Sequence, residues 1–338
     1  MASLKDISLK CGVSVATVSK ALNNHTDISD ETRERVRRAA KELGYSPNLS
    51  ARALKTNKTH GIGVLFVDEA NSGLTHDYFA SVLDSFKSTV EEKGYDITFI
   101  NCSSKQPNPM TYLETSKCHG FDGVVIACID FNDPQVIELV QSDIPIVTID
   151  YMFNDRAAIM SDNISGMMDL TEYIIGKGHK KIAYIHGDLS TVTKSRLTGF
   201  YHAAEKCGIT IPEEYVKECG YRNTAGAYEF TKELLSMKNR PTCILYPDDF
   251  AALGGLNAIR EMGLRIPEDI SVAGYDGIRL VRQLEPRITT LCQATDKIGS
   301  MAAKKLVNLI EKPKTTIIDH VVIKGSILEG VTVADLNH

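Results

Sequence analysis

The stretch that most constrains the fold of this chain is 3–23, which carries the pattern of two short helices joined by a tight turn. Ser3 can cap the first helix, and Asp6 follows three residues later, where an acidic side chain favours a helix N-terminus. Gly12 supplies the turn, and Ser14 can cap a second helix. These local signals predict a helix-turn-helix.

The second helix of such a motif fits the major groove of DNA. Val18 and Leu22 recur at i and i+4 and are expected to face inward, which leaves small and hydroxyl side chains on the outer face. Ser and Thr can bond to bases or phosphates there, and Ala or Val can contact a thymine methyl. The candidate DNA-contacting residues of this segment are Ser14, Val15, Ala16, Thr17, Ser19, Lys20 and Asn23. The alternative is a helical hairpin that only packs against its neighbours.

A third helix and the uneven charge of the chain favour DNA binding. Ser29 can cap that helix, and its apolar stripe consists of Val36, Ala39, Ala40 and Leu43. Residues 1–58 hold eleven Lys/Arg and six Asp/Glu, a net charge of +5. The whole chain carries −5, so the remainder carries −10. A basic head on an acidic body points to an anionic partner for the head alone.

Residues 46–60 are predicted to connect two domains. Residues 46–48 break the chain, and 49–55 resume as a single short helical segment that is too short to be stable alone. Residues 56–60 form a polar linker and mark a domain boundary.

From residue 61 onward, apolar strands alternate with helices, which predicts parallel sheets covered on both faces. Two such series imply two doubly wound subdomains, with ligands bound beyond the carboxyl ends of the strands. The predicted strands are 61–67, 96–101, 123–127, 145–149, 181–185, 242–246 and 271–274. The predicted helices are 78–93, 110–117, 134–141, 164–177, 195–207, 224–237 and 250–262.

Several function classes lose their main support. The sequence has no GxGxxG after its first strand, no GxxxxGK[ST] and no GxSxG. His186 and Asp188 could be a catalytic pair, but a polar strand end lining a binding cleft is the commoner arrangement. The eight cysteines form no CxxC pair, so we expect no disulfide framework, no metal site and no cofactor. Without a signal peptide pattern or a long apolar run, a cytoplasmic protein without membrane contact is expected.

The chain resembles the lactose-repressor (LacI/GalR) family of bacterial transcription regulators over nearly its whole length. The motifs that carry the resemblance in the head and hinge are Gly12-Val13-Ser14, Ala16-Thr17-Val18-Ser19 and Gly44-Tyr45-Ser46-Pro47-Asn48. Those in the body include 178–183, Asp249-x-x-Ala252-x-Gly254, 266–272, Gly274-Tyr275-Asp276 and 286–290. The family implies a regulator that is not an enzyme and that binds a roughly palindromic operator as a homodimer or higher oligomer.

The resemblance also implies domain boundaries. It places a helix-turn-helix head at 1–45, a hinge helix and linker at 46–60, and a body like a periplasmic binding protein at 61–338. Within the body the chain crosses three times between an N-subdomain (61–160 and 291–322) and a C-subdomain (161–290 and 323–338). The hinge helix would lie in the minor groove, with Leu54 as a wedge between base pairs. The hinge residues expected to contact DNA are Asn48, Ala51, Arg52, Leu54 and Lys55.

The resemblance further suggests the residues that hold a small effector. Arg offers a planar fork, and carboxylates accept hydrogen bonds from sugar hydroxyls, while aromatic rings suit an apolar ring face. The candidates are Tyr78, Phe79, Asp150, Arg196, Tyr221, Asp248 and Asp276. Alternatively, Arg196 and Asp276 could simply pair across the cleft. Two departures from the family pattern are the longer loop at 68–77 and Asp248, which stands where Asn is common.

These features predict a repressor of carbohydrate genes controlled by a sugar or sugar phosphate. A purine-responsive corepressor system is the alternative within the family. A cytosolic sugar-binding module, or an enzyme with a vestigial head, is the alternative outside it. The sequence does not decide between an inducer and a corepressor.

Overall fold

The computed structural model describes residues 2–23, 25, 27–45, 58–68, 73–100 and 109–337. The chain divides into two compact units, Met1–Thr59 and His60–His338. The predicted hinge contacts lie outside the described residues, and so does the predicted end of the second strand at Asn101.

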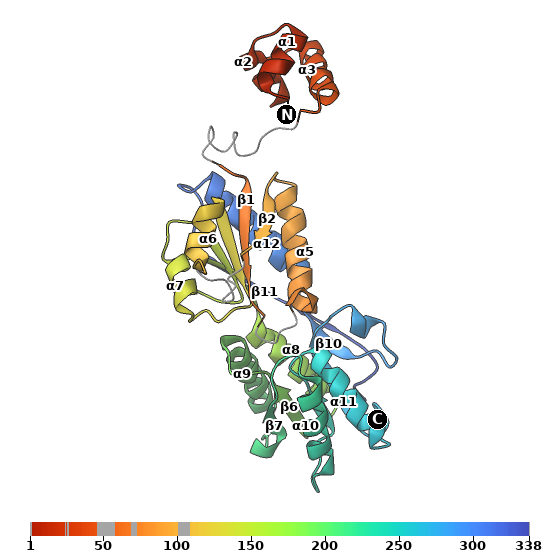
Figure 1. The fold of residues 1–338 in the computed structure, drawn as a ribbon. Coiled ribbons are helices and arrows are strands. Elements are labelled where there is room, and N and C mark those ends of the chain that lie inside the picture. Colours follow the sequence, from red (N-terminus) through yellow and green to blue (C-terminus); the bar gives the residue numbers. More distant parts are fainter. Residues whose placement is uncertain are drawn as a thin grey trace. The chain divides into compact units, whose positions relative to one another are not determined.

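The head consists of α1 (Leu4–Cys11), α2 (Val15–Leu22) and α3 (Asp30–Glu42) (Figure 1). Ser3 and Asp6 form a reciprocal capping box at the start of α1, as the sequence predicts. Ser14 caps α2 by accepting from Thr17 N at 3.0 Å. Gly12 ends α1 with φ of 66°, a left-handed conformation that costs glycine little.

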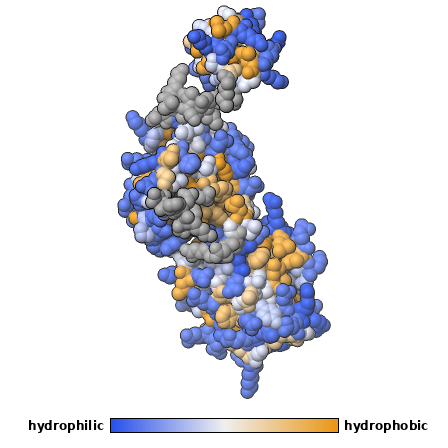
Figure 2. All heavy atoms as spheres, in the orientation of Figure 1, coloured by the Kyte–Doolittle hydropathy of each residue, from blue (hydrophilic) through white to orange (hydrophobic). Residues whose placement is uncertain are grey.

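The core of the head is small and closed by all three helices. Its fully buried residues are Ile7, Val18, Ala21 and Val36, with Ala39 and Ala40 nearly buried. Leu22, which was expected to face inward, is half-buried at the edge of this core, and Ala21 takes the inner position. Hydrophobic and hydrophilic residues mix on the visible face of the head (Figure 2).

The first subdomain of the body is a six-stranded sheet in the order β11-β5-β4-β3-β1-β2, with all neighbours parallel. Helices α5 and α12 cover one face of this sheet, and α6 and α7 cover the other (Figure 1). The strands are β1 (Gly61–Phe66), β2 (Asp96–Phe99), β3 (Gly123–Ala127), β4 (Ile146–Ile149), β5 (Ala157–Ser161) and β11 (His320–Ile323). The helices are α5 (Asp77–Glu91), α6 (Tyr112–His119), α7 (Pro134–Val140) and α12 (Thr295–Glu311).

The second subdomain is a six-stranded sheet in the order β12-β10-β9-β8-β6-β7, in which the edge strand β12 is antiparallel. Helices α8 and α9 pack on one face, and α10 and α11 pack on the other. The strands are β6 (Ile182–His186), β7 (Val216–Glu218), β8 (Cys243–Leu245), β9 (Ser271–Asp276), β10 (Thr289–Cys292) and β12 (Ser326–Leu328). The helices are α8 (Asn163–Gly176), α9 (Thr191–Lys206), α10 (Thr224–Ser236) and α11 (Asp249–Glu261).

The chain passes between the two sheets after β5, after β10 and after β11. Residues 291 and 292 pair within the second sheet as part of β10, so the return expected at 291 comes two residues later. Likewise Ser161 and Ile323 belong to the first sheet. The strand and helix predictions omitted β5, β7, β10, β11, β12 and α12, and they began α9 four residues late. None of the described helices is long and apolar enough to cross a membrane.

Candidate functional site

A cavity of about 260 Å³ lies where the carboxyl ends of the strands of both subdomains meet. Six of the seven predicted effector contacts line it, namely Tyr78, Phe79, Asp150, Arg196, Tyr221 and Asp276. Their elements come from opposite subdomains, which is the position where doubly wound folds bind ligands. The cavity wall also includes Asp188, Ser190, Thr191, Val192, Phe131 and Tyr151.

On the side of the first subdomain, Asp150 follows β4 with φ of 58°, an uncommon conformation for a residue with a side chain. The Tyr78 hydroxyl donates to Asp150 Oδ2 at 2.5 Å, and Ser161 N donates to Oδ1 at 2.8 Å. Burial raises the pKa of Asp150, although these two hydrogen bonds oppose the effect. Tyr78 therefore positions Asp150, in addition to lining the cavity with its ring.

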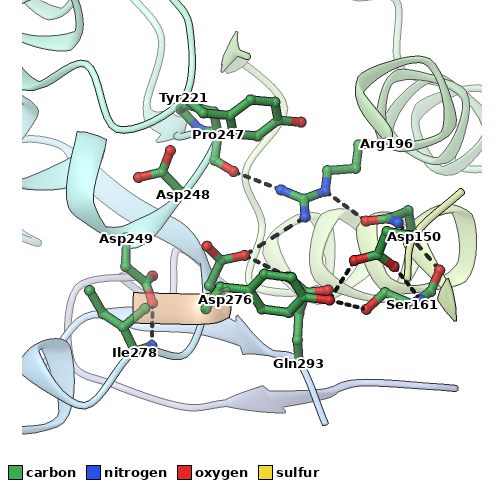
Figure 3. A network of polar contacts seen from close by, with 12 residues as sticks. Asp150, Ser161, Arg196, Tyr221, Pro247, Asp248, Asp249, Asp276, Ile278 and Gln293 are labelled. Carbon is green, nitrogen blue, oxygen red and sulfur yellow. Dashed lines mark hydrogen bonds and ion pairs between the residues drawn. The ribbon is translucent and has the colours of Figure 1, made fainter. Parts of the chain in front are cut away.

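On the side of the second subdomain, the Arg196 side chain points toward the Pro247 carbonyl and Asp276 (Figure 3). Its Nε donates to Asn163 Oδ1 and its Nη1 donates to the Pro247 carbonyl, both at 2.8 Å. Its guanidinium carbon lies 3.7 Å from the centroid of the Tyr275 ring. With 5% of its side chain exposed, Arg196 is a fixed, preorganised cation at the cavity wall.

Asp276 ends β9 with φ of 103°. Its Oδ1 accepts from Gln293 Nε2 at 2.7 Å and lies 3.7 Å from Arg196 Nη2, so these two residues do pair, but loosely. Its side chain is 10% exposed. Burial raises the pKa of Asp276 to about 7, although Arg196 and Gln293 lower it. Strained backbone at two carboxylates that line one cavity is typical of a binding site.

The aromatic candidates have different environments. The Tyr221 hydroxyl is 2.8 Å from Thr193 Oγ1, and the Tyr221 ring packs so closely on Gly187 that a Cβ there would lie 2.2 Å from it. Phe79 contacts Phe66, His76 and Tyr78 with its ring and is half-buried. Both rings line the cavity.

Asp248, the seventh predicted effector contact, is not among the residues that line the cavity. Its Oδ1 caps α11 by accepting from Ala251 N, and its Oδ2 accepts from Arg222 N, both at 2.7 Å. Both oxygens thus hold backbone amides, which is a structural role that an Asp N-cap commonly has.

Three residues that organise the site were missed by sequence reasoning. Ser161, Asn163 and Gln293 hold Asp150, Arg196 and Asp276, respectively. Ser161 ends β5, Asn163 follows β5 and Gln293 follows β10, so all three lie where the chain passes between the sheets. The hydrophobic pattern did not reveal β5 or β10, so it gave no signal for these three residues. His186, considered as a catalytic residue, is buried in β6 with its Nδ1 2.8 Å from the Gly187 carbonyl.

In the head, the predicted DNA contacts of α2 are on its outer face. Val15, Ala16 and Lys20 are exposed, and Thr17 and Ser19 are half-buried. Thr17 Oγ1 lies 2.8 Å from Ser14 Oγ, and Asn23 Nδ2 donates to the Ser19 carbonyl at 2.8 Å. Lys20 pairs with Asp27 at 2.5 Å, but both side chains are about half exposed, so the pair contributes little to stability and can open.

Comparison with known proteins decides the family. Residues 3–48 match the model of bacterial regulatory proteins of the lacI family, and 171–333 match a periplasmic binding protein-like domain. The chain is 32% identical over 346 aligned positions to the HTH-type transcriptional repressor PurR of Escherichia coli O139:H28, covering 99% of this chain and 98% of the relative. The chain belongs to the LacI family of bacterial regulators. The prediction of a DNA-binding transcriptional regulator is thereby confirmed.

Solved structures of transcriptional regulators have the same fold. The lac repressor dimer bound to operator and the anti-inducer ONPF aligns with a TM-score of 0.80 at 25% identity, covering 98% of this chain and 99% of that one. A complex of the transcriptional regulator CelR with cellobiose aligns with a TM-score of 0.71 at 24% identity, covering 98% and 100%. The fold class expected from the sequence is confirmed by these similarities.

Proposed function

We propose that this LacI-family chain is a sequence-specific repressor that binds operator DNA as a homodimer and is controlled by a small carbohydrate. The observation that carries the effector class is the pair of half-buried carboxylates, Asp150 and Asp276, which line the cavity together with the fixed cation Arg196. Carboxylates accept hydrogen bonds from hydroxyls, and a guanidinium donates to ring or hydroxyl oxygens. A polyhydroxylated ligand offers both kinds of group at once.

The apolar wall of the cavity supports the same class of ligand. The rings of Phe131 and Tyr151 are stacked with their centroids 4.2 Å apart, and both line the cavity beside Phe79. Aromatic faces provide a large apolar contact at a low cost in conformational entropy. A cavity of about 260 Å³ is at the small end of ligand sites, so a monosaccharide or its phosphate is favoured over a larger oligosaccharide.

A purine effector is the second candidate, and one observation favours it. The relative at 32% identity over almost the full chain is named PurR, a purine repressor by that name. A flat nucleobase could also lie against the stacked rings. It offers fewer hydroxyl donors, however, and two carboxylates that accept hydrogen bonds suit it less well.

Control by an effector follows from its position between the subdomains. A ligand that contacts both subdomains stabilises the arrangement in which its contacts are made, and so shifts the population of states. In a dimer, that shift changes the spacing of the two heads on DNA. The operator is expected to be roughly palindromic, and the protein to act in the cytoplasm.

Ligand screening on the full-length protein tests the effector class. Thermal shifts are measured against pentoses, hexoses, their phosphates, and the nucleobases adenine, guanine and hypoxanthine. We expect stabilisation by at least one sugar or sugar phosphate, and changed affinity for an operator selected from random DNA. Stabilisation by a nucleobase alone would replace the carbohydrate with a purine. Failure to select any palindromic sequence would contradict the repressor itself.

A further inference from the structure

Three side chains with metal-binding atoms meet in the wall of the cavity. Asp68 follows β1, His76 precedes α5, and Cys128 follows β3 with φ of 52°. A carboxylate oxygen of Asp68, a ring nitrogen of His76 and the Cys128 sulfur all lie within 4.8 Å of one another. Each of these residues lines the cavity.

The contacts around this cluster join two of its members to each other, and one ring nitrogen of His76 has no hydrogen-bond partner among the described residues. Asp68 Oδ2 accepts from Gly73 N at 3.0 Å, while Oδ1 lies 4.0 Å from Cys128 Sγ. His76 Nδ1 is buried and has no hydrogen-bond partner among the described residues. An unpartnered buried nitrogen is unfavourable unless something binds it.

The mixture of one sulfur, one nitrogen and one oxygen ligand selects the ion. Mg²⁺ and Ca²⁺ prefer oxygen ligands alone, whereas Zn²⁺ binds all three kinds in tetrahedral sites. With bond lengths of about 2.0–2.3 Å, tetrahedral ligand atoms lie roughly 3.4–3.8 Å apart. Small side-chain rotations bring atoms that lie within 4.8 Å of one another to that separation.

We propose that Asp68, His76 and Cys128 bind one Zn²⁺ ion in the wall of the effector cavity, leaving the fourth coordination position to a water or a ligand oxygen. This site goes beyond the proposed function, since a metal here would add a Lewis-acid contact to whatever the cavity binds. It also departs from the expectation that the chain has no metal site.

The sequence gives no sign of this metal site because its three residues do not follow a known ligand spacing. The spacing from 68 to 76 is eight residues, and from 76 to 128 it is fifty-two, which matches no short ligand motif. Strands β1 and β3 are neighbours in the sheet, so their carboxyl ends bring Asp68 and Cys128 together. The longer loop at 68–77 then supplies His76.

Cobalt spectroscopy of the full-length protein tests the site. Co²⁺ is titrated into reduced, metal-free protein, because a thiolate ligand gives Co²⁺ a near-ultraviolet charge-transfer band. We expect this band to saturate at one Co²⁺ per chain in the wild type and to be absent in Cys128→Ser. The matched controls are Cys118→Ser and Cys207→Ser, which replace exposed cysteines and should keep the band.

Zn²⁺ affinity gives a second, independent measurement. Competition with a chromophoric chelator should show that His76→Gln and Asp68→Asn each weaken Zn²⁺ binding at least tenfold, since even residues outside the ligand shell typically contribute 10- to 100-fold. Melting curves without metal show whether each variant is folded. If Cys128→Ser does not fold, the Zn²⁺ affinities of His76→Gln and Asp68→Asn test the site on their own.

The proposal is overturned if the wild type shows no charge-transfer band or if the band survives Cys128→Ser. It is equally overturned if folded His76→Gln and Asp68→Asn keep wild-type Zn²⁺ affinity. The measurements need neither operator DNA nor a sugar, so their failure is distinct from a failure of the proposed function.

Discussion

Arg222 Nη1 donates to Asp77 Oδ2 at 3.0 Å and thereby joins the two subdomains of the body. Arg222 lies between β7 and α10, and Asp77 is the first residue of α5. The guanidinium also donates to the Thr75 carbonyl at 3.2 Å and lies 4.2 Å from the centroid of the Phe250 ring. The Arg222 side chain is 10% exposed and that of Asp77 is 38% exposed, so only the arginine end of the contact is shielded from solvent.

We expect this pair to stabilise the arrangement of the subdomains that binds the effector. Asp77 is 38% exposed, so the pair is closer to a surface ion pair, worth about 0.2–1 kcal/mol, than to a buried one. Asp77→Asn and Arg222→Gln should each weaken effector binding about 1.5- to 5-fold in calorimetric titrations. A double mutant should lose little more than either single mutant. Additive losses would show that the two residues act separately.

Asp276→Ala should weaken effector binding roughly ten- to a hundredfold, because a charged hydrogen bond of this kind contributes on the order of 1.5–3 kcal/mol. Operator binding without effector should persist, since the substitution lies in the body and leaves the sequence of the head unchanged. Calorimetry and an operator gel shift measure the two effects side by side. Asp169→Asn, an exposed position on α8, is the control and should change neither. Unchanged effector affinity in Asp276→Ala would mean that the cavity is not the effector site.

The raised pKa of Asp276 predicts a pH dependence of stability. Because the pKa of Asp276 is about 7 in the folded protein and 3.8 for an ordinary aspartate, this group favours folding most below pH 4 and loses that contribution as the pH rises to about 7. Asp276→Asn mimics the protonated form and should lack this loss. Its melting temperature relative to wild type should therefore increase from pH 5 to pH 7 and then level off. A difference that stays constant with pH would exclude the titration of Asp276.

The protonation of Asp276 should also change the affinity of the protein for its effector. Hydroxyl donors bind the ionised carboxylate better, so wild-type effector affinity should fall by up to about tenfold per pH unit below pH 7. In Asp276→Asn, affinity should be weaker and should lose this part of the pH dependence. Calorimetric titrations at pH 6, 7 and 8 compare the two proteins. A wild-type affinity that rises toward low pH would contradict a hydroxyl-donating ligand at Asp276.

Substitutions in the recognition helix and in the hinge should have different effects on DNA binding: the first should change the preferred operator, and the second should weaken binding overall. Ala16→Val or Thr17→Val should change which operator is preferred, because both positions are on the outer face of α2. Arg52→Ala or Lys55→Ala should weaken binding to most sequences alike and reduce the salt dependence by about one counterion each. Gel shifts at several salt concentrations on selected and scrambled operators measure both effects. Salt-insensitive binding would contradict a phosphate-contacting basic head.

Local sequence was sufficient for the elements whose signals lie within a few residues. The caps Ser3, Ser14 and Ser29 begin the three helices of the head, and each accepts a hydrogen bond from the amide three residues later. The buried apolar runs at β1 and β3 are continuous, which is typical of strands covered on both faces. Caps and buried runs depend on neighbours along the chain, so they can be read before the fold is known.

The points where the chain crosses between the two subdomains could not be predicted from such local signals. Strands such as β10 and β12 are three or four residues long, and β12 stabilises the second sheet only through its pairing with β10. A short strand has little periodicity of its own, and its partner is distant in sequence. Family resemblance placed the crossings within one or two residues, but the hydrophobic pattern alone did not.

The sequence by itself determined the helix-turn-helix, the alternation of strands and helices, and the identities of Arg196 and Asp276 as candidate contacts. Only the tertiary structure decided that Asp248 accepts a hydrogen bond from Arg222 N and does not line the cavity, and that Asp68, His76 and Cys128 meet. The physical reason is the same in both cases. A side chain's partners are set by which strand ends become neighbours in the sheet, and strand order depends on packing between segments that are far apart along the chain.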